Sequence, residues 1–145
     1  MAVQTIKINK DDSHFVNSIF ETFMHDADEK PSASHLQTLL TDDRTYVFVA
    51  LSDNAVIGYA LAYRFPSLYA AESLAYLYDI EVLKTHRRKG AGRQLIQTML
   101  THLKADGVGE LWLGTATDNT EGQGLFAGTG GLRSGETFND FTYEL

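Results

Sequence analysis

A basic, glycine-containing turn between two apolar segments is the feature that most limits what this chain can fold into. Residues 74–82 are rich in strand-forming apolar side chains, and residues 94–103 repeat apolar positions at helical spacing. Between them, residues 84–93 hold five of the chain's twelve Lys and Arg residues, and Gly90 and Gly92 lie two positions apart. Glycine lets the backbone approach a ligand closely, and a helix N-terminus binds anions through its amides. The segment predicts a strand, turn and helix that can bind a phosphorylated ligand; the alternative is a plain turn with solvated charges.

The composition limits the class of protein. With 145 residues, 43% of them apolar, we expect one domain over residues 1–145 with a proper hydrophobic core. The absence of cysteine excludes disulfides, thiolate metal sites and cysteine nucleophiles. We find no signal peptide and no long apolar segment, so we expect a cytoplasmic location and no membrane contact. A net charge of −7 argues against nucleic-acid binding; it reflects either solubility alone or acidic groups around a cleft for a cationic substrate.

Hydrophobic periodicity and turn residues predict one mixed α/β domain with the element order β-α-α-β-β-β-α-β-α-β-β. Ser52, Asp53 and Asn54 separate two strand-like runs and predict a β-hairpin. The expected strands cover residues 3–8, 45–51, 55–63, 74–82 and 110–115, with two more near 135–137 and 141–145. The expected helices cover residues 13–23, 94–103 and 120–126, with a short one that begins at residue 32 or 34 and ends at 40.

The glycine-containing turn matches neither of two common nucleotide motifs. The chain has no G-x-x-x-x-G-K-[ST], and it has no G-x-G-x-x-G followed by a suitably spaced acidic residue. What remains is Arg87-x-x-Gly90-x-Gly92, which resembles the pyrophosphate loop [QR]-x-x-G-x-[GA] of the GCN5-related N-acetyltransferase (GNAT) superfamily. The resemblance covers nearly the whole chain, and its other parts are Ile57-Gly58-Tyr59, Ile80-Glu81-Val82 and Asn119-x-x-Gly122-x-x-Leu125-Phe126-x-x-x-Gly130.

This resemblance implies a GNAT fold, a single mixed and mostly antiparallel sheet of six or seven strands flanked by about four helices, and acetyl-CoA as cosubstrate. The amides from Arg87 to Gly92 would then hold the pyrophosphate, with nearby basic side chains adding charge. The main chain around Val82 and Leu83 would pair with the pantetheine arm and direct an amide at the thioester oxygen. The residues assigned in this way to acetyl-CoA are Ile80, Val82, Leu83, Arg87, Arg88, Lys89, Gly90, Ala91, Gly92, Arg93, Asn119 and Phe126.

The chain departs from the family pattern at two places. The family usually has Ala-x-x-[LF]-Tyr where this chain has Gly122-x-x-Leu125-Phe126, and Gly-Phe where it has Gly130-Gly131. The family tyrosine commonly protonates the leaving thiolate, and Phe126 cannot do so. A thiol with a pKa of about 8.5 leaves tolerably well unaided. Tyr76, Tyr78 or Tyr143 could substitute, although each can equally be a core or surface aromatic residue.

Asp79 and Glu81 are the candidate bases. An alkyl amine arrives as an ammonium ion, so a carboxylate near the thioester must accept a proton before the nitrogen can attack. The two residues lie at i and i+2 on the predicted strand 74–82 and share one sheet face unless a bulge intervenes. The alternative is that both are solvated positions on an exposed face.

The run Tyr76-Leu77-Tyr78-Asp79-Ile80-Glu81-Val82, followed by His86-Arg87-Arg88, resembles the class I aminoglycoside 3-N-acetyltransferases. That resemblance implies acetylation of an aminoglycoside amine, the 3-amino group, with antibiotic resistance as the result. It places Asp79 beside the substrate amine and assigns Tyr78, Asp79, Asp118 and Glu121 to the substrate. The family's acidic run is thinner here, which leaves the antibiotic range open; Asp26, Asp28 and Asp140 could line the same cleft.

Two other functions remain open. The acceptor can be another small polyamine, an amino acid or a protein amine, or the chain can be a non-catalytic CoA-binding module, for which Phe126 is the main argument. The five histidines show no H-x-x-x-H or similar spacing, so we expect no metal. Dimers are common among similar proteins, so a homodimer is compatible with the resemblance.

Overall fold

The computed structural model describes residues 2–24 and 30–145 of the chain. Asp26 and Asp28, two of the acidic residues considered above, lie outside the described residues. The described chain divides into two compact units, Met1–Gly114 and Thr115–Leu145, which we treat separately. That all 145 residues form one domain stays a prediction.

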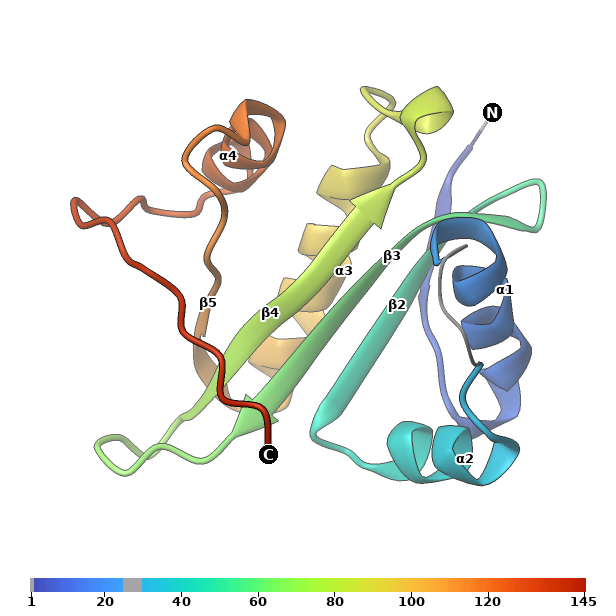
Figure 1. Cartoon of the computed structure of the whole chain (residues 1–145), viewed down its shortest axis with the longest axis horizontal. Coiled ribbons are helices and arrows are strands. Elements are labelled where there is room, and N and C mark those ends of the chain that lie inside the picture. Colours follow the sequence, from blue (N-terminus) through green and yellow to red (C-terminus); the bar gives the residue numbers. More distant parts are fainter. Residues whose placement is uncertain (1, 25–29) are drawn as a thin grey trace. The chain divides into compact units, whose positions relative to one another are not determined.

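The first unit is built on a five-stranded sheet in the order β1-β2-β3-β4-β5 (Figure 1). Neighbouring strands are antiparallel except β4 and β5, which are parallel. This confirms the expected mixed, mostly antiparallel sheet. The strands are β1 (Gln4–Lys7), β2 (Thr45–Ser52), β3 (Ala55–Phe65), β4 (Ser73–Val82) and β5 (Val108–Trp112).

The number of strands was predicted wrongly, because the described chain has five instead of six or seven. The segments near 135–137 and 141–145 form no strand, and their residues are exposed. Phe141, Tyr143 and Leu145 alternate as in a strand, but an isolated strand is not stable without a partner for its backbone groups. No strand among the described residues pairs with this segment.

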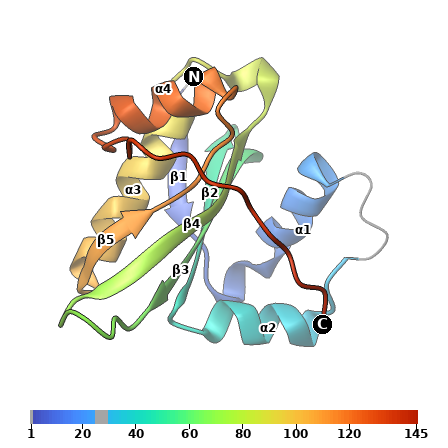
Figure 2. The ribbon, with the colours of Figure 1, turned by 60° about the vertical axis from the view of Figure 1, so that its left-hand side comes forward.

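Helices cover both faces of the sheet (Figure 2). On one face, side chains of α1 (Ser13–Phe23) and α2 (Ala33–Thr41) join a cluster with Val47 and Val49 of β2. On the other face, His102 of α3 (Ala91–Ala105) contacts the ring of Phe48, with 5.4 Å between ring centroids. The alternation of residues 47, 48 and 49 between faces follows from the period of two in a strand. Two 3₁₀ turns, η1 (Lys10–Asp12) and η2 (Lys84–His86), complete this unit.

Small side chains line the part of the sheet that faces α3. Ala50, Ala60 and Ala62 are fully buried, and Ala60 lies opposite Phe48 in the β2–β3 pairing. Large residues of α3, including Leu95 and Met99, fill the space that these alanines leave. The packing therefore holds α3, and with it the turn before α3, close to β3 and β4.

The predicted hairpin is confirmed between β2 and β3. Asp53 and Asn54 form its two-residue turn with φ values of 49° and 64°. Such left-handed conformations at both positions characterise a type I′ turn, in which Asp and Asn are well tolerated.

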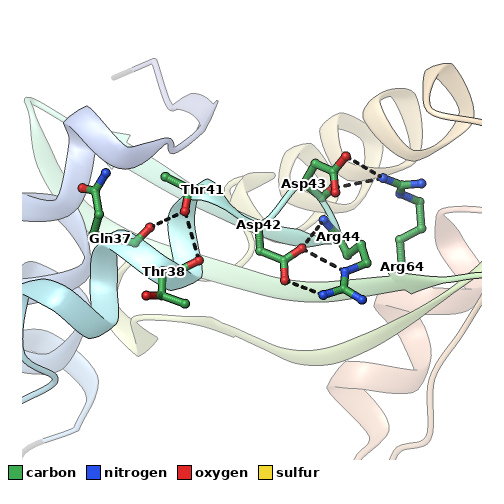
Figure 3. Close-up of polar contacts among 7 residues, drawn as sticks. All are labelled: Gln37, Thr38, Thr41, Asp42, Asp43, Arg44 and Arg64. Carbon is green, nitrogen blue, oxygen red and sulfur yellow. Dashed lines mark hydrogen bonds and ion pairs between the residues drawn. The ribbon is translucent and has the colours of Figure 1, made fainter.

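A polar network fixes the corner where α2 leads into β2 (Figure 3). Asp42 accepts hydrogen bonds from Arg44 Nε and Nη2 at 3.0 and 2.9 Å, and from the Arg44 amide at 2.9 Å. Arg64 of β3 donates to the Asp43 carbonyl at 3.2 Å and pairs with its carboxylate at 3.7 Å. Arg64 Nε also donates to the Tyr46 hydroxyl at 3.0 Å. Arg64 of β3 therefore contacts a residue before β2 begins and a residue within β2.

Candidate active site

Asp79 and Glu81 share one face of β4. Leu61 lies opposite Asp79, whereas Ala62 lies opposite Leu77, so Tyr78 is an extra residue in a β-bulge. The bulge precedes both carboxylates, which therefore keep the normal alternation and lie on the face that α1 and α2 partly cover. Asp79 is half-buried and Glu81 is exposed. The exposed setting of Glu81 matches the solvated alternative more closely than a desolvated base.

Tyr59 contacts Asp79 directly, and the sequence reasoning missed it as a site residue. The Tyr59 hydroxyl donates to Asp79 Oδ2 at 2.5 Å. Burial, followed by the hydrogen bond to Asp79 and the nearby carboxylates, raises the pKa of Tyr59 well above its usual value of 10.0. The phenol is therefore a constant hydrogen-bond donor. Only the β3–β4 register could have revealed the pair, and the bulge at Tyr78 shifts that register.

An aromatic row lies on the same sheet face, and we define it by Tyr63, Phe65, Tyr76, Tyr78 and Trp112. Ring centroids are 6.0 Å apart for Tyr63 and Tyr78, 6.4 Å for Tyr76 and Tyr78, 5.2 Å for Tyr76 and Trp112, and 5.3 Å for Phe65 and Trp112. Tyr78 is 66% exposed and Trp112 is 41% exposed. The aromatic row therefore presents flat apolar surface beside Asp79.

The outer edge of β4 is only partly used by the sheet. β5 pairs with Ser73–Tyr76, and no strand of the described chain pairs with residues 77–82 on that edge. At the end of β4, the Val82 carbonyl accepts from Arg87 Nε at 2.9 Å, and the Leu83 amide donates to the Ile57 carbonyl at 2.8 Å. The Leu83 amide is thus already engaged. Ile80 and Val82 remain on the unpaired stretch of the edge.

The turn after β4 has the backbone geometry that the glycines suggested. Arg88 and Gly90 adopt positive φ values of 62° and 89°, and Gly90 is the N-cap of α3. A Cβ on Gly90 would meet no atom within 4 Å, so the space beside this turn is open. Gly90 has no side chain with which to cap the helix, and the first amides of an α-helix have no acceptor within it.

The chemistry of this turn fits a pyrophosphate group. The first turn of α3 provides amides and the positive end of its dipole, and Arg88, Lys89 and Arg93 have exposed side chains. Ala91, by contrast, is buried and can contribute only its backbone. Gly92 follows at the second helical position, where a missing side chain keeps the amides accessible.

In the second unit, Asn119 is the N-cap of α4 (Thr120–Gly128), and both polar atoms of its side chain form hydrogen bonds. Asn119 Oδ1 accepts from the Gly122 amide at 3.0 Å, and Nδ2 donates to Thr115 Oγ1 at 2.9 Å. A Cβ on Gly122 would lie 2.4 Å from Asn119 Nδ2, so an alanine at this position would require the Asn119 side chain to shift. The structure thus gives Asn119 a capping role.

Two glycines form a close turn at the end of α4. Gly130 has a φ of 99°, and the Gly131 amide donates to the Phe126 carbonyl at 2.8 Å, as in a Schellman motif. A Cβ on Gly131 would lie 2.8 Å from that same carbonyl oxygen. Phe126 is half-buried, and Asp118 and Glu121 are exposed. These second-unit residues are described apart from Asp79 and the α3 turn, which belong to the first unit.

Two general features of the described residues bear on the class of function. Among residues 2–24 and 30–145, no group of three or more His, Asp or Glu side chains is placed to hold a metal ion. None of the helices in the described part of the chain has both the length and the apolar content needed to cross a bilayer.

Comparison with known proteins identifies the family. Residues 13–130 match the model of the acetyltransferase (GNAT) family. The chain therefore belongs to this family, whose members use acetyl-CoA, and the resemblance seen in the sequence is confirmed.

Individual relatives agree with this assignment. The chain is 27% identical over 107 residues to N-acetyltransferase family 8 member 3 of Mus musculus, covering 74% of this chain and 46% of the mouse protein. The chain thus spans about half the length of that curated relative. It is 26% identical to an aminoglycoside acetyltransferase from an uncultured soil metagenomic sample, solved with sisomicin, with a TM-score of 0.85 over 99% of this chain and 96% of that one. Aminoglycoside N-acetyltransferase AAC(6′)-Iy in complex with CoA shares the fold at 19% identity, with a TM-score of 0.74 over 98% and 100% of the chains.

Proposed function

We propose that this protein transfers the acetyl group of acetyl-CoA to an amine of an aminoglycoside. The proposal rests mainly on the position of Asp79. This half-buried carboxylate lies on β4, the strand that leads into the turn before α3, whose backbone amides suit an anion. The complex of the 26% identical soil protein with sisomicin supports an aminoglycoside as the acceptor. The resemblance of residues 76–82 to the class I enzymes supports the 3-amino group as the target and antibiotic resistance as the outcome.

The reaction assigns one task to Asp79. The carboxylate takes a proton from the substrate ammonium, directly or through water, and the free amine nitrogen attacks the thioester carbonyl carbon. A C–N bond forms, the C–S bond breaks, and CoA leaves as a thiolate that takes up the proton that the nitrogen loses as it becomes an amide. Glu81, exposed two residues further along β4, is the second candidate for the base and otherwise adds negative charge for a cationic substrate.

Acetyl-CoA would bind across the end of β4 and the start of α3. The amides of residues 87–92 would hold the pyrophosphate, with charge from Arg87, Arg88, Lys89 and Arg93. The Leu83 amide already donates to the Ile57 carbonyl. The pantetheine arm would therefore form its main-chain hydrogen bonds with Ile80 and Val82, on the unpaired edge of β4. Asn119 and Phe126, which belong to the second unit, are assigned to acetyl-CoA by the family resemblance alone.

The acceptor site would combine carboxylates with flat apolar surface. Aminoglycosides carry several ammonium groups on sugar rings, so a carboxylate beside exposed aromatic rings matches both features. Tyr78 and Asp79 offer these two properties at adjacent positions. Asp118 and Glu121 are exposed on the second unit, and the family resemblance alone assigns them to the substrate.

A second acceptor class is favoured by a specific observation. The mouse relative carries the name N-acetyltransferase without an aminoglycoside, so a different small amine or a protein amine is the competing substrate. Phe126 replaces the tyrosine of the family pattern, so the protein could also be a CoA-binding module without catalytic activity. The experiment below distinguishes this alternative from an enzyme. A homodimer stays a prediction.

The test is a thiol-release assay with acetyl-CoA and a panel of aminoglycosides, polyamines and amino acids. We expect turnover with gentamicin-type substrates and at least a 100-fold loss of kcat in Asp79→Asn, as for removal of a general base. The matched control is Asp11→Asn, an exposed aspartate of η1, which should keep wild-type turnover.

Each result separates the alternatives. Turnover that survives Asp79→Asn moves the base to Glu81. Release with polyamines or amino acids alone removes the aminoglycoside acceptor but keeps the chemistry. Acetyl-CoA binding without any turnover favours the non-catalytic CoA-binding module.

A further substrate tests which amine is acetylated. Paromomycin has a hydroxyl in place of the 6′-amine, so it remains a substrate if the 3-amino group is the target. NMR of the product then locates the acetyl group.

A further inference from the structure

The two oxygens of Asp79 differ in their surroundings. Oδ2 accepts the hydroxyl of Tyr59 at 2.5 Å. Across residues 2–24 and 30–145 no protein donor reaches Oδ1, and no buried side-chain oxygen in that part of the chain lacks a partner, so Oδ1 is accessible to solvent. The carboxylate therefore has one oxygen held by the protein and one oxygen available to a ligand.

Tyr59 itself is rigidly held. Its side chain is 4% exposed and belongs to the core cluster between the sheet and helices α1 and α2. Its ring packs edge-on against Phe23 of α1, with 5.0 Å between centroids, and its backbone lies between Val49 of β2 and Glu81 of β4. A donor fixed in this way restricts the rotation of the carboxylate that it contacts.

We propose that Tyr59 is a positioning residue that fixes the rotation of the Asp79 carboxylate, so that Oδ1 alone receives the proton of the acceptor amine. The inference rests on the proposed function of Asp79 and adds a residue that acts through it. A carboxylate free to rotate would spend part of its time in orientations from which the amine proton is out of reach, and misplacement by about 1 Å can cost about 100-fold in rate.

The same geometry excludes Tyr59 as a replacement for the acid that Phe126 cannot supply. Its hydroxyl already donates to Asp79 Oδ2, and its raised pKa makes it a poor proton donor to a thiolate. A positioning role and an acid role therefore predict different pH profiles. Loss of an acid alters the alkaline limb of kcat, whereas loss of positioning lowers kcat at every pH.

The decisive variant is Tyr59→Phe, which keeps the ring contact with Phe23 and removes only the hydroxyl. With an aminoglycoside as acceptor, we expect kcat to fall at least tenfold across the pH range, with an unchanged KM for acetyl-CoA. In the Asp79→Asn background the same substitution should have no further effect on kcat. The matched control is Tyr46→Phe, another buried tyrosine whose hydroxyl donates to an aspartate (Asp106, 2.6 Å), but on the α3 side of the sheet. It should leave kcat unchanged.

A measurement without any Tyr59 substitution accompanies the kinetics. In protein labelled with ¹³Cζ-tyrosine, the Tyr59 signal should titrate well above the usual tyrosine pKa of 10.0, and in Asp79→Asn its titration should move to lower pH, because the hydrogen bond and the nearby charge both raise the pKa of Tyr59. The positioning role alone is overturned if Tyr59→Phe keeps the wild-type kcat. It is also overturned if Tyr59→Phe lowers kcat by the same factor in wild-type protein and in the Asp79→Asn background. Failure of the wild-type protein to acetylate any amine overturns the proposed function and the inference with it.

Discussion

Gly58 of β3 lies directly opposite Val82, the last residue of β4. A Cβ on Gly58 would lie 3.0 Å from the Glu81 carbonyl oxygen, 3.2 Å from Val82 Cγ2 and 3.4 Å from Leu95 Cδ1. The glycine thus lets β3, β4 and α3 meet closely at the strand end that leads into the basic turn.

The substitution Gly58→Ala should therefore destabilise the protein. Overpacking of this kind costs about 1–3 kcal/mol, because backbone or side chains must shift to admit the methyl group. Urea unfolding at neutral pH measures the change. Gly114→Ala is the control, since a Cβ there meets no atom within 4 Å, and its free energy of unfolding should stay near wild type. Equal stability of the two variants would contradict the close packing.

Gly90→Ala tests the backbone of the turn separately from its stability. A left-handed conformation costs a non-glycine residue about 1–2 kcal/mol, and Gly90 has a φ of 89°. Gly107, with a φ of 84° and equally open surroundings, lies just after the other end of α3.

Gly90→Ala and Gly107→Ala should therefore lose similar stability in urea unfolding. If the turn binds the pyrophosphate, only Gly90→Ala should also raise the KM for acetyl-CoA, by about tenfold when one to two backbone hydrogen bonds are misplaced. An equal KM in both variants would remove the turn from the binding site.

Tyr46 makes stability depend on pH in the alkaline range. Burial, followed by the hydrogen bond to Asp106, raises the pKa of Tyr46 to about 12 from its usual 10.0. The folded state holds the proton more tightly than the unfolded state, so this contribution is complete below pH 10 and is lost as the pH rises to about 12. In urea unfolding, Tyr46→Phe should show a shallower loss of stability over that range than wild type. Tyr69→Phe, at an exposed position, should follow the wild-type curve.

Asp42 acts in the opposite direction at acid pH. The hydrogen bonds from Arg44 hold the pKa of Asp42 at about 2, below its usual 3.8. The carboxylate therefore contributes stability above about pH 4, and this contribution is lost as the pH falls toward 2. Thermal unfolding of Asp42→Asn should depend less on pH over this range than that of wild type. The difference should shrink in 1 M salt, because the pair is exposed.

Local sequence signals predicted most of the first unit. The hairpin turn at Asp53 and Asn54, the helical periodicity of α3 and the alternation of β2 each reflect forces between near neighbours, and all three elements form as expected. The two C-terminal strands were predicted wrongly, because Phe141 and Tyr143 have the right alternation but no partner strand in the described part of the chain. Local patterns do not contain the pairing partner of a strand.

The candidate site was predictable in its charged residues but not in their partners. Asp79 and the turn with Gly90 are visible in the sequence because their residue types are distinctive. The hydrogen bond from the Tyr59 hydroxyl to Asp79 depends on the β3–β4 register, which shifts where Tyr78 forms the bulge. The engagement of the Leu83 amide by Ile57 depends on the β-sheet geometry at the same strand end. Both are tertiary features that spacing along the chain does not specify.

The aromatic row also bears on how this protein can change. The alanines that face α3 sit in close packing, where an added or removed methyl group is felt by the whole fold. Tyr78 projects from the other face with 66% of its surface uncovered, so replacing it removes less packing than replacing a core residue. A gene library randomised at this one codon should therefore consist mainly of folded proteins, and it offers directed evolution a tolerant starting point for new acceptors.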